Sequence, residues 1–274
     1  DEVIVFEPAY DSYAPVIKIN GGNPIYVGAK LPDYKIDWDE VNKMVNARTR
    51  MIIINSPHNP SGSILSAEGL ERLNKLVTGT KILILSDEVY EHLVFDGHKH
   101  ESVARFPSLK ERSIVVSSFG KTYNATGWKI GYCLASENVT KEIRKIHQFN
   151  VFAVNTPIQL ALANFLDNTD AYQEIGQFYQ NKRNEFLKML DGTKFTFTPS
   201  QGTYFQMLNY KEISEEKDVD FANRLITEYK IASVPVSAFY HNSYDGKVLR
   251  FCFAKSTEVL EKAAEILHRV SKNG

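Results

Sequence analysis

Residues 113–132 read SIVVSSFGKTYNATGWKIGY, and this stretch carries the sharpest structural signal in the 274-residue chain. Residues 114–116 are a β-branched apolar run, which predicts a buried parallel strand. Small and polar residues then surround Lys121, and a second apolar run follows at residues 130–135. In open α/β sheets, ligands bind beyond the carboxyl ends of strands. The stretch therefore places a lysine where a buried strand would open into a binding site.

Lys121 allows more than one interpretation at this point. A phosphate-binding P-loop would need a glycine five residues before Gly120, but Val115 stands there, so that motif is excluded. A lysine that forms a Schiff base with an aldehyde cofactor, with Ser118 and Lys129 on the cofactor's phosphate, remains open. A solvated surface lysine remains open as well, since that is the usual fate of this side chain.

Composition describes an ordinary globular chain. Hydrophobic residues make up 43% and charged residues 24%, and 32 basic against 33 acidic side chains give a net charge of −1. This balance predicts no general nucleic-acid or membrane surface, and no apolar run approaches the ~20 residues of a membrane helix. Cys133 and Cys252 lie in apolar runs, which predicts buried reduced thiols in a cytoplasmic protein. The spacing of histidines and cysteines predicts no metal site.

The order of the apolar runs predicts an α/β fold. Short strand-like runs alternate with helical patterns through the first part of the chain, which is typical of a mostly parallel sheet flanked by helices. Residues 170–190 read as one long helix, and residues 195–274 read as a smaller α+β unit. We therefore expect a large domain at residues 1–170, and an interdomain helix with a small C-terminal domain at residues 171–274.

Polar side chains follow several of the predicted strands. Asp87 comes directly after the apolar run 81–85, and an acid there needs a cationic partner or water. Tyr90 would point the same way if a helical turn begins there. Asn55 and Asn59 flank a turn whose prolines explain the turn but not the two amides.

Two further residues each have a functional and a structural interpretation. Tyr10, after the first predicted strand, would stack on a flat ring or pack as an ordinary aromatic side chain. Arg250 interrupts the apolar run 248–253. Its planar fork suits a carboxylate, but an edge-strand arginine that reaches to water is the simpler interpretation for that residue alone.

Together these segments resemble the pyridoxal-phosphate-dependent class I aminotransferases of fold type I. The resemblance covers essentially the whole chain and rests on segments in the family's order and spacing: 59–62 NPSG, 86–90 SDEVY, 118–122 SFGKT, 127–131 GWKIG and 249–255 LRFCFAK. Segments 7–13 EPAYDSY and 55–60 NSPHNP, with His147-Gln148, look closest to the branch of bacterial methionine aminotransferases and kynurenine or glutamine transaminases. The resemblance implies an α/β fold of this type, a homodimer, and amino-acid and 2-oxo-acid substrates.

The resemblance also implies a role for each candidate residue. Lys121 would hold pyridoxal 5'-phosphate covalently, and Asp87 would pair with its pyridinium nitrogen. Tyr90 and Asn59 would bind the ring hydroxyl, and Tyr10 would stack on the ring. Ser118 and Lys129 would contact the phosphate. Arg250 and Asn59 would bind the substrate carboxylate, with Asn55 as a supporting amide and Phe152 lining the pocket, across a dimer interface. The catalytic set is then Lys121, Asp87 and Tyr90.

These residue types suit the chemistry of transamination. Removing the Cα proton leaves negative charge that the cofactor ring absorbs, and a carboxylate beside the ring nitrogen favours its protonated form. Once the substrate amine has displaced it, Lys121 is free to move the proton from Cα to the cofactor. The lysine must then be an uncharged amine, a form that desolvation and the nearby Lys129 favour.

We expect transamination of an amino acid with a large uncharged side chain, with Tyr13, Phe152 and Tyr240 as pocket candidates. A carbon–sulfur β-lyase acting on cysteine S-conjugates or cystathionine shares the same residues and stays open. A non-catalytic regulator domain is the alternative of another class. Retention of Lys121, Asp87, Tyr90 and Arg250 argues against this last alternative.

One departure from the family concerns the N-terminus. The family has a further large-domain segment before the position of Asp1, including a glycine-containing turn that binds the phosphate, and an N-terminal arm. We therefore expect the natural protein to be longer and this chain to bind the cofactor weakly. Titration with pyridoxal phosphate, followed by absorbance, tests this expectation.

Overall fold

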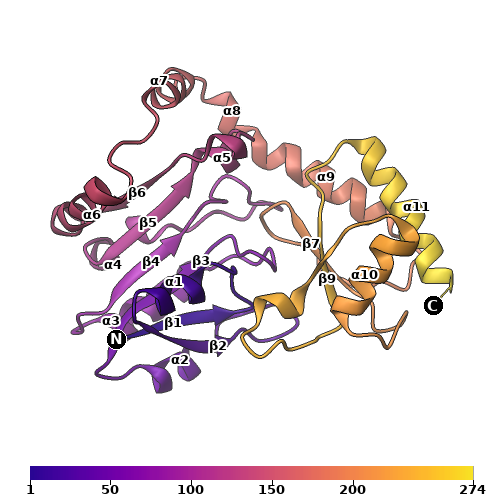
Figure 1. Cartoon of the computed structure of the whole chain (residues 1–274), viewed down its shortest axis with the longest axis horizontal. Coiled ribbons are helices and arrows are strands. Elements are labelled where there is room, and N and C mark those ends of the chain that lie inside the picture. The colour runs from indigo at the N-terminus through magenta and orange to yellow at the C-terminus, as the bar shows by residue number, and fades with distance from the viewer. Residues whose placement is uncertain (274) are drawn as a thin grey trace.

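A computed structural model describes residues 1–273 of the chain and shows two groups of strands (Figure 1). The first group forms a six-stranded sheet in the order β2-β1-β3-β4-β5-β6. Its strands are β1 (Glu2–Glu7), β2 (Asn23–Gly28), β3 (Thr49–Asn55), β4 (Leu83–Asp87), β5 (Ser113–Ser118) and β6 (Gly131–Ala135). Strands β1 to β5 run parallel and β6 is antiparallel to β5. The carboxyl ends of β3, β4 and β5 therefore share one edge of the sheet, as the predicted α/β fold requires.

Helices connect these strands and continue into the C-terminal part. They are α1 (Tyr13–Ile19), α2 (Trp38–Met44), α3 (Ala67–Val77), α4 (Pro107–Lys110), α5 (Phe119–Thr122), α6 (Glu137–Asn150), α7 (Thr156–Phe165), α8 (Asp170–Gln173), α9 (Ile175–Met189), α10 (Asp218–Tyr229) and α11 (Thr257–Asn273). Short 3-10 turns are η1 (Val103–Arg105), η2 (Thr126–Trp128) and η3 (Val236–Phe239). Within residues 1–273, the helices are too short or too polar to cross a membrane.

The second group of strands forms a three-stranded antiparallel sheet in the order β7-β9-β8. Its strands are β7 (Phe205–Asn209), β8 (Val234–Pro235) and β9 (Val248–Cys252). Helices α9, α10 and α11 share an apolar core with this sheet, in which Phe186, Leu225 and Leu267 are almost fully buried. Leu93 and Phe95, from the loop after β4, belong to the same core and tie the two sheets together.

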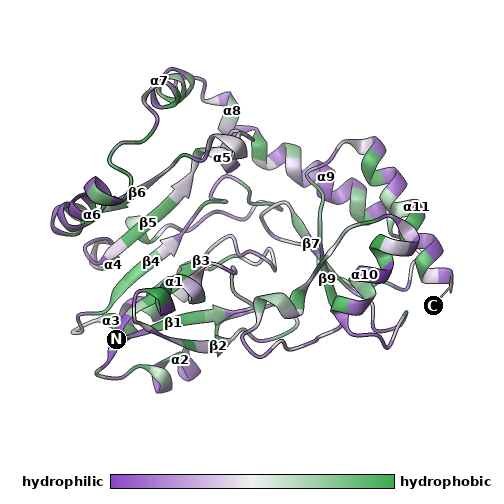
Figure 2. Cartoon of the chain, in the orientation of Figure 1, coloured by the Kyte–Doolittle hydropathy of each residue, from purple (hydrophilic) through white to green (hydrophobic). Residues whose placement is uncertain are grey.

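The core of the large sheet follows from the β-branched runs that predicted it. Ile4, Ile52 and Ile84 are fully buried on neighbouring strands β1, β3 and β4, and Leu70 and Leu73 of α3 join the same core. Figure 2 shows the hydrophobic colour concentrated along these strands. Each such side chain contributes about 1.5–3 kcal/mol of hydrophobic free energy, which holds the polar strand ends in place.

Three structural expectations are corrected. The single helix expected at residues 170–190 is two helices, because the chain breaks at Glu174 between α8 and α9. Cys133 is exposed and Cys252 is half-buried, so neither is the buried thiol that their apolar runs predicted. Arg250 does not lie on an edge strand, because β9 is central in its sheet.

Candidate active site

Lys121 and Tyr90 meet at the carboxyl edge of the large sheet. Lys121 lies in α5, directly after β5, and its Nζ donates a hydrogen bond of 3.0 Å to the hydroxyl of Tyr204. The same Nζ lies 5.9 Å from the centre of the Tyr90 ring. Tyr90 is 3% exposed, and burial, followed by the neighbouring Tyr204, raises the pKa of its phenol well above the usual range. The lysine thus occupies a partly buried aromatic setting rather than open solvent.

Asp87 is a half-buried acid at the end of β4. Its carboxylate accepts hydrogen bonds from the hydroxyl of Tyr13 and, at 3.3 Å, from the backbone N–H of Val89. Removal from water raises the pKa of Asp87, while the bond from Tyr13 and the charge of Lys121 oppose that rise. Among residues 1–273, no cationic side chain forms a salt bridge with this carboxylate. The site therefore offers a negative charge that a bound cationic group would complete.

Asn55, Asn59 and Arg250 form one hydrogen-bonded chain. The Asn55 Nδ2 donates to the backbone oxygen of Asp87 at 2.9 Å, and its Oδ1 accepts from the backbone N–H of Asn59 at 2.8 Å. Arg250 Nη1 donates to Asn59 Oδ1 at 2.6 Å. These contacts give each asparagine a role: Asn55, the last residue of β3, braces the turn that follows, and Asn59 in that turn binds the arginine.

Aromatic rings enclose the Arg250 guanidinium. Its central carbon lies 4.0 Å from the centre of the Phe205 ring and 4.9 Å from that of Phe239. Burial lowers the pKa of Arg250 from its ordinary value. No acidic side chain among the described residues forms a salt bridge with it. The guanidinium is therefore held by stacking and one neutral amide, and its charge is available to a carboxylate.

Ser118 and Lys129 line a pocket of about 280 Å³ together with Lys121. The backbone of Lys129 has a left-handed conformation, with φ of +54°, at the end of η2. Gly120 lies in the wall, where an added Cβ would come 3.0 Å from the Cα of Thr126. A hydroxyl and two amines around one small pocket give a site for an anionic group.

Tyr10 and Phe152 are less enclosed than the other candidates. Tyr10 is 41% exposed and packs edge-on against Tyr13, with ring centres 5.5 Å apart. Phe152 lies between α6 and α7 and is 81% exposed. These two helices lie far from β7 and β9 in Figure 1. The role of Phe152 across a dimer interface stays a prediction.

A larger cavity of about 1070 Å³ adjoins the site without containing its charged groups. Tyr13 and Asn55 line it, together with Tyr240 and Tyr244 from the C-terminal part. Lys121, Asp87 and Arg250 are not in its wall. The cavity is therefore a neighbour of the candidate site.

Sequence reasoning missed the contacts of Tyr204 and Tyr13 with the charged groups. Tyr13 was expected as a pocket aromatic and lines the adjoining cavity, and its hydroxyl also binds Asp87, 74 positions away in the chain. Tyr204 was not among the candidate residues, and its hydroxyl accepts a hydrogen bond from Lys121, which lies 83 positions earlier in the chain. Neither pairing leaves a local signal, since both depend on how the two sheets meet.

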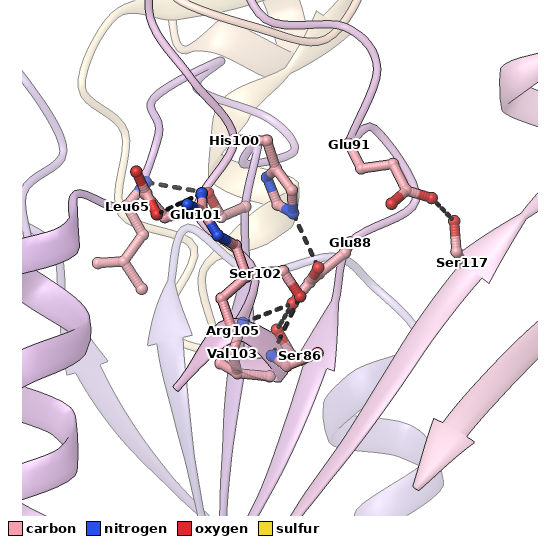
Figure 3. A network of polar contacts seen from close by, with 12 residues as sticks. Leu65, Ser86, Glu88, Glu91, His100, Glu101, Ser102, Val103, Arg105 and Ser117 are labelled. Atoms are coloured by element: carbon pink, nitrogen blue, oxygen red, sulfur yellow. Dashed lines mark hydrogen bonds and ion pairs between the residues drawn. The ribbon is translucent and has the colours of Figure 1, made fainter. Parts of the chain in front are cut away.

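A buried polar network surrounds Glu88, the residue that follows Asp87 in the chain (Figure 3). The neighbouring Glu88 is 1% exposed, and its carboxylate accepts from the Ser86 hydroxyl at 2.8 Å and from the Val103 N–H at 3.2 Å. His100 Nε2 lies 2.8 Å from the other carboxylate oxygen. These contacts fasten the loop that carries His100 to the end of β4.

We expect Glu88→Gln to destabilise the fold by about 1–3 kcal/mol, because one of its buried partners then faces an amide N–H₂. The urea-unfolding free energy of the variant measures this. Glu101→Gln is the control, since Glu101 pairs with Arg105 at the surface and should cost under about 1 kcal/mol. Equal losses in the two variants would contradict a structural role for the Glu88 network.

Known proteins share this fold and this order of segments. Residues 1–267 match the family model described as aminotransferase class I and II. The chain is 42% identical to the methionine aminotransferase of Escherichia coli K12, over 98% of this chain and 70% of that protein. It is 34% identical to the kynurenine–oxoglutarate transaminase of Dictyostelium discoideum, over 99% of this chain and 72% of that protein.

Solved structures agree. The structure of Escherichia coli YbdL, described with a methionine aminotransferase function, superimposes with a TM-score of 0.96 at 42% identity, over 98% of this chain and 71% of that one. The N-succinyldiaminopimelate aminotransferase of Mycobacterium tuberculosis gives a TM-score of 0.94 at 32% identity, over 98% and 71%. The chain therefore belongs to the class I and II aminotransferase family.

Proposed function

We propose that this aminotransferase uses pyridoxal 5'-phosphate to convert amino acids with large uncharged side chains into their 2-oxo acids. The observation that carries the proposal is the convergence of three charged groups. Lys121 Nζ lies 5.9 Å from the centre of the Tyr90 ring. Arg250 is joined to the backbone of Asp87 by hydrogen bonds through Asn59 and Asn55. These residues come from β4, from the turn after it, from the helix after β5 and from β9, and they were predicted as one site.

The residues present fit the cofactor at both of its ends. The half-buried Asp87 carboxylate lacks a salt-bridge partner among residues 1–273, which suits a protonated ring nitrogen. The pocket of Ser118, Lys121 and Lys129 suits a phosphate. Tyr10 is partly exposed, which leaves its ring accessible for stacking on a flat ring. In this proposal Tyr90 and Asn59 bind the hydroxyl of the cofactor ring.

Each residue then has a physical task. When bound, the cofactor supplies a sink for the negative charge that proton loss leaves at Cα. Arg250 and Asn59 hold the substrate carboxylate and so fix the Cα position, while Asn55 keeps Asn59 in place. The Lys121 amine removes the Cα proton and delivers it again. Burial under the aromatic rings excludes water, which strengthens each electrostatic contact.

Support for the substrate class comes from the relatives and from the aromatic lining. The two curated relatives named above act, by their names, on methionine and kynurenine. Tyr240, a pocket candidate, is half-buried, and its ring centre lies 5.3 Å from that of Tyr244 in the adjoining cavity. An uncharged side chain suits such a surface.

A panel of amino acids and 2-oxo acids tests the function, run on the longest form of the protein that contains this chain. We expect conversion of methionine, aromatic amino acids, glutamine or kynurenine, with cofactor absorbance changing at each half-reaction. Pyruvate and ammonia from a cysteine conjugate, without an acceptor, would identify the β-lyase instead. Cofactor binding without turnover of any compound would identify a regulator and overturn the proposal.

We expect Arg250→Lys to raise KM for the amino acid about 100-fold with a smaller effect on kcat, because lysine lacks the fork that binds a carboxylate at two points. Steady-state kinetics with methionine measure this. Arg224→Lys is the matched control, since that arginine also stacks on a ring, Phe221 at 5.0 Å, but pairs with Glu216 away from the site. An unchanged KM in Arg250→Lys would remove the carboxylate role.

We further propose two domains, a homodimer and a cytoplasmic location. The two separate sheets support a large domain at residues 1–170 and a small one, with its leading helix, at residues 171–274. Ile146, Phe149 and Phe152 are 70%, 87% and 81% exposed on and after α6, and such apolar exposure favours a partner surface. The two free cysteines agree with a reducing compartment. Sedimentation velocity tests the dimer.

A further inference from the structure

The amine of Lys121 has one hydrogen-bond partner among the described residues, and that partner comes from the C-terminal part of the chain. Nζ donates to the Tyr204 hydroxyl at 3.0 Å and lies 5.7 Å from the centre of the same ring. A lysine stem has about 2 kcal/mol of rotamer entropy, so a free Nζ would sample many positions. One rigid partner narrows that range.

Tyr204 is such a rigid partner. Its ring packs edge-on against Tyr90 and Phe205, with centres 5.2 and 4.7 Å away. The Tyr204 backbone oxygen accepts from the N–H of Phe253 at 3.0 Å. The preceding Thr203 is fully buried with φ of +66°, and its hydroxyl accepts from the N–H of Phe205 at 3.1 Å. The hydroxyl of Tyr204 is therefore fixed by contacts on both ring and backbone.

We infer that the Tyr204 hydroxyl is a positioning group that holds the Lys121 amine in place for proton transfer. The inference rests on the proposed role of Lys121. A phenol hydroxyl both donates and accepts, whereas an ammonium only donates. The contact therefore survives when Nζ gains the Cα proton and when it loses that proton to the cofactor, and Tyr204 keeps its own proton throughout.

Tyr204 lies next to the small sheet, and its hydroxyl can be removed without changing the residues proposed to bind the carboxylate. Tyr204 directly precedes β7, and β7 pairs with β9 so that Met207 lies opposite Arg250. One small sheet thus holds both the residue that meets the amine and the residue that meets the carboxylate. Removing the hydroxyl alone leaves Arg250 and its stacking on Phe205 in place, so substrate binding should persist.

Tyr204→Phe tests the inference because it removes the hydroxyl and keeps the ring. We expect kcat to fall roughly 10- to 100-fold with KM changed less than about twofold, since a small misplacement of a reacting group costs this much. The isotope effect on kcat with an α-deuterated amino acid should rise, because proton transfer becomes slower. Tyr179→Phe is the control: its hydroxyl donates to Asn124 at 2.7 Å, and its ring also packs against Tyr204.

A second measurement needs no turnover. In the cofactor-free chain, trinitrobenzenesulfonate labels exposed amines, and peptide mass spectrometry gives the rate at Lys121 relative to Lys129. We expect this ratio to rise about fivefold in Tyr204→Phe, because one hydrogen bond to the amine is lost, and to stay unchanged in Tyr179→Phe.

The outcomes are distinct. An unchanged isotope effect with an unchanged labelling ratio overturns the inference, and so does an equal response in Tyr179→Phe, which would indicate ring packing. Absence of transaminase turnover in the unsubstituted protein would instead overturn the proposed function, while the labelling ratio would still report on the Tyr204 contact.

Discussion

Replacing Lys121 with alanine is expected to reduce transamination at least about 10⁴-fold, which is the largest effect of any single substitution in this chain. The amine is both the covalent anchor proposed for the cofactor and the group that moves the Cα proton, and general acid–base catalysis alone contributes about 10²–10⁴-fold. Lys121 directly follows β5 and donates to Tyr204. Among the described residues, no other amine forms a hydrogen bond with Tyr204 that could replace it. Initial rates with methionine and a 2-oxo acid measure the loss.

Lys141→Ala is the matched control for that experiment, since Lys141 is an exposed helix lysine paired with Glu137. It should keep full activity, and both variants should keep the wild-type unfolding free energy within about 1 kcal/mol. The anchor role adds a spectroscopic result: borohydride should fix pyridoxal phosphate to the unsubstituted protein but not to Lys121→Ala. Retention of turnover within tenfold would show that another group moves the proton.

Asp87→Asn is expected to lower kcat about 10²- to 10³-fold, the usual cost of removing one preorganised charge from a site. Asparagine can still accept the bond from Tyr13, so the local geometry persists while the negative charge proposed to face the ring nitrogen is lost. The amino-acid KM should change little, because Arg250 is untouched. Single-turnover absorbance with methionine separates the chemical step from binding.

Asp87→Asn should lower activity but raise the free energy of unfolding of the cofactor-free chain. Burial raises the pKa of Asp87 in the folded chain. When the pKa of a carboxyl is higher in the folded chain, the folded state keeps a proton at a pH where the unfolded state has already released it. The folded state therefore loses stability as the pH rises from the pKa of the unfolded chain to that of the folded chain. At pH 7 the cofactor-free Asp87→Asn chain should therefore be more stable than wild type to urea. The gain should vanish at pH 3, and its persistence there would contradict this account.

The large sheet and half of the site were predictable because their signals are local. The β-branched run at 114–116 and the polar residues that follow it require only the period of a strand and the rule for strand ends. Asp87 and Asn55 follow from the same rule on β4 and β3. The chemistry that these residues carry was then recognisable from their order in the chain.

The rest depended on contacts that no local pattern records. Arg250 looked like an edge arginine until β8 and β7 were found on either side of β9. Tyr204 was not recognised as a site residue, because its partner Lys121 lies 83 positions away in the chain. The break at Glu174 carries no proline or glycine at that residue, so pattern alone could not separate α8 from α9.

The bond between Arg250 and Asn59 spans 191 positions and joins the small sheet to the loop after β3. If the C-terminal third opens transiently, Lys121 and Asp87 stay in place on the large sheet side, but the contact of Arg250 with Asn59 at the carboxylate site is lost. A simple carboxylic acid that binds Arg250 should therefore select the closed assembly and slow proteolysis of the C-terminal third by mass action. A low substrate concentration would then speed proteolysis of the protein as well as lower its rate of catalysis.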